Sequence, residues 1–233
     1  MCGKFTQRRI AVEAWTEFHD LADAGDAENI EGWLTGAAEP DGLTPMRFAM
    51  VTRKGVHGRA ETVPMRWGVS ALSAENPSKP DHIHARCETI DEKPTFRDAF
   101  RERRGLLLVH SFNEGEEVSP TKTVQHIITP RDGKMLAIAV LWEAWRHTAL
   151  GELLTFTMVT TPANALIGAI TDRMPAVLDP KDYAAWLGLA PATQAELKAM
   201  LKPHDGASWD MTPEKKTPPP KKPKVASTQG ELF

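Results

Sequence analysis

The second residue of the chain is a cysteine, and its position allows chemistry that an internal cysteine cannot perform. Cys2 is followed by Gly3, and cytosolic processing generally removes an initiating methionine before so small a residue. The exposed cysteine would carry an amine and a thiol two carbons apart, a pair that condenses with an aldehyde to an imine and then a five-membered thiazolidine. Reference pKa values of about 8 and about 8.5 leave a fraction of both groups reactive near neutral pH. The alternative is a frayed terminal residue with no role.

The remaining composition excludes several other kinds of site. Cys2 and Cys87 are the only cysteines, too few for a disulfide framework, and no CxxC or HExxH motif predicts a zinc site. No apolar run approaches the roughly 20 residues of a membrane-spanning helix, and the start MCGKFTQRR lacks a signal-peptide core. We therefore expect a cytoplasmic protein that needs no metal, no cofactor and no membrane.

The elements that must position Cys2 are short strands mixed with a few helices, which predicts an α+β fold. We expect strands at 46–53, 62–69, 106–112, 126–130, 135–145, 153–161 and 176–178, and helical segments at 11–24, 95–103, 162–170, 180–188 and 191–201.

The composition changes near residue 214. The segment EKKTPPPKKPK favours extended polyproline II and cannot bury a core, so we predict one domain over 1–213 and a disordered tail over 214–233. From Lys215 onward the tail carries a charge of +4, which leaves −7 for the rest of a chain whose net charge is −3. An acidic domain that holds DNA must do so through a local basic groove.

Six blocks give the chain a family resemblance. In order they are CGKF (2–5), RWG (66–68), ARCET (85–89), RGLLLVHSFNE (104–114), MVTTPAN (158–164) and TDRMPAVL (171–178). Their content and order resemble the SOS-response-associated peptidase (SRAP) family, whose members process abasic sites and cross-link to DNA. The resemblance covers roughly 2–210 and implies a single domain of mainly antiparallel sheets in a barrel-like core with peripheral helices. It also implies a nucleoid-associated monomer with a DNA-damage function, lyase-like chemistry and self-peptidase chemistry at the Met1–Cys2 bond.

The family uses four site residues, and this chain keeps two of them. Cys2 matches the terminal Cys, and Glu114 matches a Glu that would relay protons while the closed sugar opens to its aldehyde. The family Asn is replaced by His84, and the family His by Thr171. We hypothesise that His84, which can titrate near neutral pH, shares the proton transfer. The alternatives are a solvated Glu114 in an acidic turn and a His84 that is only a polar wall.

Several residues in these blocks are candidates for contacts with single-stranded DNA, because cations and hydroxyls follow phosphates and aromatic rings stack on bases. Arg66 with Trp67 could offer a cation and a stacking face, although Trp67 equally fits a core position. The candidates are Lys4, Arg66, Trp67, Arg86, Thr160 and Arg173.

The last residues resemble the peptide that bacterial repair proteins insert into the sliding clamp. Gln229 would fix the register while Leu232 and Phe233 fill an apolar groove. The alternative is a random disordered end.

Two other functions remain open from the sequence. N-terminal-nucleophile glutamine amidotransferases also begin Met-Cys-Gly, but Lys4 is an unusual continuation for them. A non-catalytic module would bind single-stranded DNA and recruit the clamp without chemistry. We favour the hypothesis that the protein cross-links to DNA, with abasic single-stranded DNA as its partner.

Overall fold

The computed structural model describes residues 2–7, 42–69, 80, 82–147 and 151–215. Strands dominate this part of the chain, and they form two sheets. The strands are β1 (Lys4–Thr6), β2 (Phe48–Lys54), β3 (Ala60–Trp67), β4 (His84–Arg86), β5 (Arg104–Val109), β6 (Ser111–Ser119), β7 (Lys122–Pro130), β8 (Leu136–His147), β9 (Gly151–Pro162), β10 (Arg173–Pro175), β11 (Val177–Leu178) and β12 (Trp209–Pro213).

Five strands of the larger sheet close into a barrel. β2 pairs with β3 and β5, β5 with β8, and β8 with β9, all antiparallel, and a parallel pairing of β3 with β9 completes the circle. β4, β10 and β11 extend this sheet along β9 and β8. Closure removes the unpaired edges that an open sheet would leave. The predicted α+β domain with a mainly antiparallel, barrel-like core and peripheral helices is therefore confirmed.

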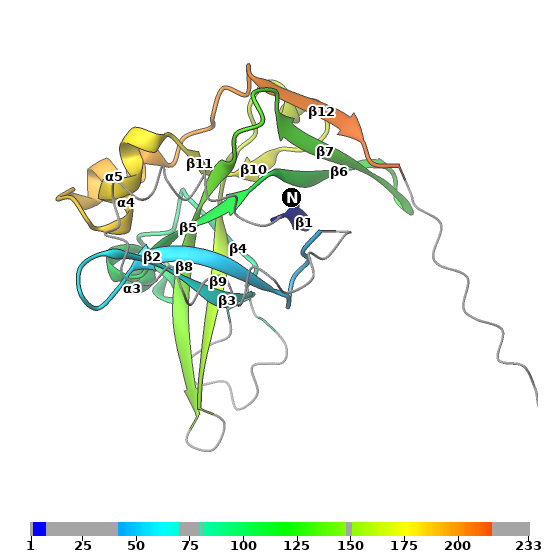
Figure 1. Cartoon of the computed structure of the whole chain (residues 1–233). Coiled ribbons are helices and arrows are strands. Elements are labelled where there is room, and N and C mark those ends of the chain that lie inside the picture. The colour runs from blue at the N-terminus through cyan, green and yellow to red at the C-terminus, as the bar shows by residue number, and fades with distance from the viewer. Residues whose placement is uncertain (1, 8–41, 70–79, 81, 148–150, 216–233) are drawn as a thin grey trace, which may run out of the picture.

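The helices of the described residues lie outside the barrel (Figure 1). α3 begins at a proline, which fits the first turn of a helix because its missing N–H would have no partner there. Thr193 caps α5 through a capping box with Glu196. The elements are α3 (Pro94–Glu102), η1 (Ile167–Ala169), η2 (Pro180–Asp182), α4 (Tyr183–Leu187) and α5 (Gln194–Met200).

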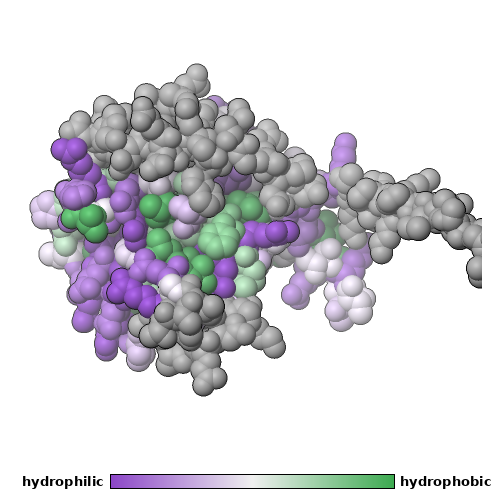
Figure 2. Space-filling model, turned by 60° about the horizontal axis from the view of Figure 1, so that its bottom comes forward, coloured by the Kyte–Doolittle hydropathy of each residue, from purple (hydrophilic) through white to green (hydrophobic). Residues whose placement is uncertain are grey.

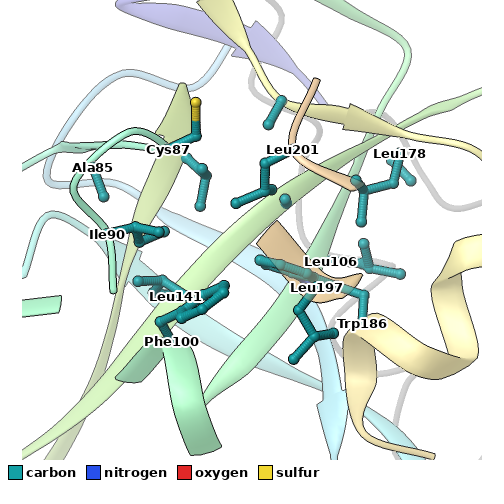
Figure 3. Close-up of a cluster of buried hydrophobic side chains, with 14 of the residues drawn as sticks. Ala85, Cys87, Ile90, Phe100, Leu106, Leu141, Leu178, Trp186, Leu197 and Leu201 are labelled. Atoms are coloured by element: carbon teal, nitrogen blue, oxygen red, sulfur yellow. The ribbon is translucent and has the colours of Figure 1, made fainter. Parts of the chain in front are cut away.

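Side-chain alternation along the barrel strands separates two cores, because successive residues of a strand point to opposite faces. On β5, Leu106 and Leu108 join the outer core beneath the helices, whereas Leu107 and Val109 join the inner core. Figure 3 shows the outer core, where Trp186 packs among leucines contributed by several elements.

The smaller sheet, ordered β1-β6-β7-β12, contributes to the inner core. Phe5 of β1 lies 5.2 Å from Trp67 of β3 between ring centroids, and Figure 1 shows β1 on the side of the smaller sheet that faces the barrel. The chain passes from the barrel to the smaller sheet at His110, whose N–H donates to the Thr6 carbonyl at 2.8 Å. β6 therefore starts beside β1 and runs along it.

The element predictions hold for the longer segments and fail at two places. The segment 106–112, predicted as one strand, is divided at His110 between β5 and β6. The helix predicted at 162–170 is wrong: β9 continues to Pro162, and a single 3-10 turn, η1, follows. The helix predicted at 11–24 lies outside the described residues. The remaining strands and helices that we predicted there are confirmed.

No helix in the described residues is long and apolar enough to span a bilayer. β12 ends at Pro213, and the domain boundary between 1–213 and 214–233 stays a prediction.

Candidate active site

Cys2 lies inside the molecule. Its side chain is fully buried in the inner core, and its thiol donates to the Lys4 carbonyl at 3.4 Å. Burial raises the pKa of the Cys2 thiol far above its usual range, and the nearby Glu114 carboxylate raises it further. Hydrogen bonds from the backbones of Lys4 and Asn113 act in the opposite direction but are smaller causes. The thiol is therefore protonated at neutral pH.

Glu114 is placed by the strand pairing of β6. Antiparallel pairing sets Asn113 opposite Lys4 of β1 and Glu114 opposite His126 of β7. The Glu114 side chain is completely buried, so the alternative of a solvated acid in a turn is wrong. Burial raises the pKa of Glu114 to about 7, while a hydrogen bond from the Cys2 backbone lowers it and the Asp172 carboxylate raises it. Glu114 is therefore poised to gain or lose a proton near neutral pH.

His84 contacts the other polar group of the Cys2 backbone. It begins β4, which pairs in parallel with β9 so that His84 lies opposite Met158. Burial lowers the pKa of His84 to about 4, and a hydrogen bond with the Cys2 backbone opposes this shift. Because a carbonyl can only accept, the imidazole N–H donates this bond. The His84 Nε2 atom is buried and has no partner among the described residues, which leaves Nδ1 as the donor.

The expectation that His84 titrates near neutral pH is wrong for this structure. An imidazole with a pKa of about 4 is neutral at pH 7. It donates through one nitrogen and accepts through the other. The Cys2 backbone is thus held between an acid that titrates near neutrality and a neutral imidazole.

Thr171 and Asp172 directly precede β10. The Thr171 N–H donates to the Ile167 carbonyl of η1 at 3.1 Å, and its side chain is half-buried. Asp172 is exposed, yet its charge raises the pKa of Glu114. Sequence reasoning gave Asp172 no role, although it lies between two candidate residues in the block 171–178. Its effect depends on strand pairing and has no local signal.

The candidate DNA-binding residues divide into exposed and buried ones. Arg86, at the end of β4, is exposed. Lys4 is half-buried and forms an ion pair with Glu214 at 2.7 Å. Trp67 is fully buried, its indole N–H donates to the Ile83 carbonyl at 3.0 Å, and its ring lies parallel to Phe156. The ring therefore presents no face to a DNA base, and the core alternative describes Trp67.

Three other candidates are held by protein groups. Arg66 is buried and donates to the Gly68 carbonyl at 3.3 Å. Arg173 is buried and pairs with Glu88 through both terminal nitrogens. Thr160 is buried beside it and accepts from Arg173 at 3.2 Å. Arg86 is therefore the candidate cation with the most accessible side chain.

Figure 2 shows the face that lies at the bottom of Figure 1, where apolar residues near the middle are bordered by hydrophilic ones.

Within the described residues no group of three or more His, Cys, Asp or Glu side chains is arranged to hold a metal ion. The predicted clamp-binding residues Gln229, Leu232 and Phe233 lie outside the described residues.

The chain is 28% identical over 209 residues to the abasic site processing protein YoqW of Bacillus subtilis, covering 88% of each chain. It is 30% identical over 211 residues to the abasic site processing protein YobE of the same organism, covering 88% of this chain and 90% of the relative. A crystal structure of a protein from Bacteroides thetaiotaomicron shares the fold with a TM-score of 0.74 at 21% identity, over 92% of both chains. The profile of one family, described as SOS response associated peptidase, matches residues 1–217. This chain therefore belongs to the SOS response associated peptidase (SRAP) family.

Proposed function

We propose that the protein recognises abasic sites in single-stranded DNA and forms a covalent thiazolidine cross-link through Cys2 after removal of Met1. The observation that carries this proposal is the position of the Cys2 backbone, which hydrogen-bonds Glu114 on one side and His84 on the other. The relatives named abasic site processing proteins support DNA with an abasic site as the substrate.

Removal of Met1 would convert the Cys2 N–H into a free amine beside the Glu114 carboxylate. An amine with a reference pKa of about 8 and a carboxyl with a pKa of about 7 can exchange a proton near neutral pH. Glu114 takes the proton of the ammonium group, and the neutral amine attacks the aldehyde carbon. Loss of one water gives the imine, and addition of the thiol across the C=N bond closes the thiazolidine.

The raised pKa of the thiol supports this order of steps. A buried, protonated Cys2 is a poor first nucleophile, because the thiolate is the reactive form. The amine therefore reacts first, and the thiol adds only when the imine is already in place. An amidohydrolase mechanism needs the thiolate at the start, so the same environment opposes that alternative.

His84 and Thr171 take the places of two residues that the family uses, and they require different roles. A neutral His84 holds the Cys2 carbonyl through Nδ1 and leaves Nε2 to accept a hydrogen bond from a sugar hydroxyl. Thr171 can donate a hydroxyl hydrogen bond but cannot titrate near neutral pH. Glu114 is therefore the principal proton carrier of the proposed reaction. The lyase-like and self-peptidase activities belong to the same proposal through the family.

Recognition of the DNA backbone would use the exposed Arg86 and Lys4 after exchange of its Glu214 partner for a phosphate. The tail would add salt-dependent affinity through its lysines and bind the sliding clamp through its last residues. A pull-down with clamp protein tests the latter: replacing Leu232 and Phe233 by Ala should abolish binding, and unchanged binding would remove the clamp from the proposal.

Intact-protein mass spectrometry with an abasic single-stranded oligonucleotide tests the proposed function. The purified protein should lack Met1, and its mass should increase by that of the DNA minus one water. Peptide mapping should place the linkage on Cys2. The same oligonucleotide without an abasic site is the control. Absence of an adduct, which is the outcome for a binding module without chemistry, or a linkage to a lysine would overturn the proposal.

A further inference from the structure

We propose that the Glu88–Arg173 ion pair is a positioning device that holds strand β4 and the segment before β10 on either side of Cys2, rather than a contact for DNA phosphate. The inference rests on the proposed function and adds two positioning residues to it. Neither side chain touches Cys2 or the reacting atoms in this assignment.

The ion pair joins segments that are 85 residues apart in the sequence. Both terminal nitrogens of Arg173 donate to the Glu88 carboxylate, the second at 3.0 Å. The guanidinium also donates to the Thr160 carbonyl at 2.8 Å and to its hydroxyl at 3.2 Å. A bidentate arginine–carboxylate pair fixes direction as well as distance. Three chain segments therefore meet at one guanidinium.

Strand register shows what this junction controls. Thr160 of β9 lies opposite Arg86 of β4 on one side and opposite Pro175 of β10 on the other. The Cys87 N–H donates to the Thr160 carbonyl at 2.9 Å, next to the bond from Arg173. His84 lies two residues before Arg86 on the same short strand. Loosening the junction would release the end of the strand that carries His84.

The other arm of the junction leads to Glu114. Arg173 directly follows Asp172, whose carboxylate raises the pKa of Glu114. The Asp172 carbonyl accepts from the Ala163 N–H at 2.9 Å, which ties this segment to the end of β9. In this proposal the ion pair holds His84 in place through β4 and holds the Asp172 carboxylate in place through the segment before β10.

The burial of Arg173 opposes a direct phosphate contact. Its side chain is 10% exposed, whereas that of Glu88 is 45% exposed. Arg173 lowers the pKa of Glu88 to about 2, so the carboxylate stays ionised at neutral pH and competes with any phosphate. A phosphate would have to displace a bidentate partner to reach the guanidinium.

The test compares Glu88→Gln, Arg173→Lys and the double variant with the full-length wild type. Asp91→Asn is the matched control, because Asp91 forms a similar ion pair with Lys198 at 2.6 Å on the same loop without contacting β10. We expect Glu88→Gln and Arg173→Lys each to reduce the rate of adduct formation at saturating DNA roughly tenfold, with the double variant no slower than either single one. The DNA dissociation constant and its salt dependence should stay unchanged.

A phosphate contact gives a different pattern. In that case Arg173→Lys weakens DNA binding and lowers the salt slope, and Glu88→Gln does not slow the reaction at saturation. A purely structural role lowers the melting temperature but leaves the rate at saturating DNA unchanged. Either result overturns the proposal.

A second readout does not depend on cross-linking. Labelled histidine followed by NMR reports the environment of His84, and Glu88→Gln should move its pKa upward toward 6.5 while Asp91→Asn leaves it in place. If the wild type forms no adduct, the proposed function fails, and this titration still decides the positioning role: an unmoved His84 would overturn it.

Discussion

Two clusters in this molecule are built from the same pair of residue types and have opposite properties. Cys2 lies near Glu114, and Cys87 lies near Glu88. Burial raises the pKa of Glu114 to about 7, whereas the Arg173 guanidinium lowers that of Glu88 to about 2. Both thiols have a raised pKa. Burial at Glu114 and a paired arginine at Glu88 therefore move the pKa values of the two carboxyl groups in opposite directions.

The largest expected effect separates the two cysteines. Cys2→Ala should abolish the adduct with abasic DNA, because no thiol remains to close the ring and trap the imine. Cys87→Ala should leave the adduct yield within about twofold of the wild type, because an internal cysteine has no free amine. Denaturing gel electrophoresis after incubation with the oligonucleotide measures both. Loss of the adduct in the Cys87 variant would contradict the assignment of the linkage to Cys2 alone.

The next largest effect is on the rate of adduct formation, which should depend on Glu114. Glu114→Gln keeps the size of the side chain but removes proton transfer, so the rate of adduct formation should fall roughly 100-fold or more. The wild-type rate should rise with pH around 7, where Glu114 ionises, whereas the rate of the variant should rise only nearer pH 8, about where the amine itself loses its proton. Stopped time courses between pH 5 and 9 provide the measurement. A wild-type rate that is flat over this range would contradict the assignment of Glu114 as the proton carrier.

The smallest effect concerns stability against pH, where the two glutamates should act with opposite sign. The pKa of Glu114 is raised from 4.5 to about 7, so the folded state favours its protonated form. Its contribution to the free energy of unfolding is therefore complete below pH 4.5 and is lost as pH rises through 7, by up to roughly 3 kcal/mol. The pKa of Glu88 is lowered from 4.5 to about 2, so its contribution is present above pH 4.5 and is lost as pH falls toward 2.

His84 determines how the Glu114 contribution is observed. Its pKa is lowered from 6.5 to about 4, so it favours the folded state increasingly as pH rises over this range and opposes Glu114 between pH 4.5 and 6.5. Urea unfolding should show stability rising with pH in Glu114→Gln and falling in His84→Gln. Parallel pH profiles for the two variants would show that one of the pKa assignments is wrong.

The sequence predicts the framework of the fold because long β-prone runs such as 135–145 and 153–161 carry their own signal. It does not predict β4 or β10, which have three residues each and depend on pairing with β9. The resemblance selects Cys2 and Glu114, but the local run of acids around Glu114 favours a solvated turn. Its burial follows from pairing with β1 and β7, which no local pattern contains.

The same limit applies to the charged and aromatic candidates. Arg173 occurs in a short block with apolar neighbours, a pattern compatible with both a ligand contact and an internal ion pair. Glu88, 85 residues away, decides between them in this structure. Trp67 next to Arg66 is typical of a stacking site, yet Phe5 and Phe156 enclose its ring. Partners distant in the sequence determine what each side chain can do.

The passage of the chain from β5 to β6 at His110 affects the order in which Cys2 and Glu114 can come together. Cys2 comes first from the ribosome, but its acid is delivered only after the chain has left the barrel strand β5 and entered the smaller sheet. β7 and β12 then enclose the far side of that sheet. A nascent or truncated chain that stops before β6 lacks Glu114, and one that stops before β7 and β12 lacks the strands that complete the smaller sheet around it, so the proton transfer proposed for Cys2 awaits the completed sheet.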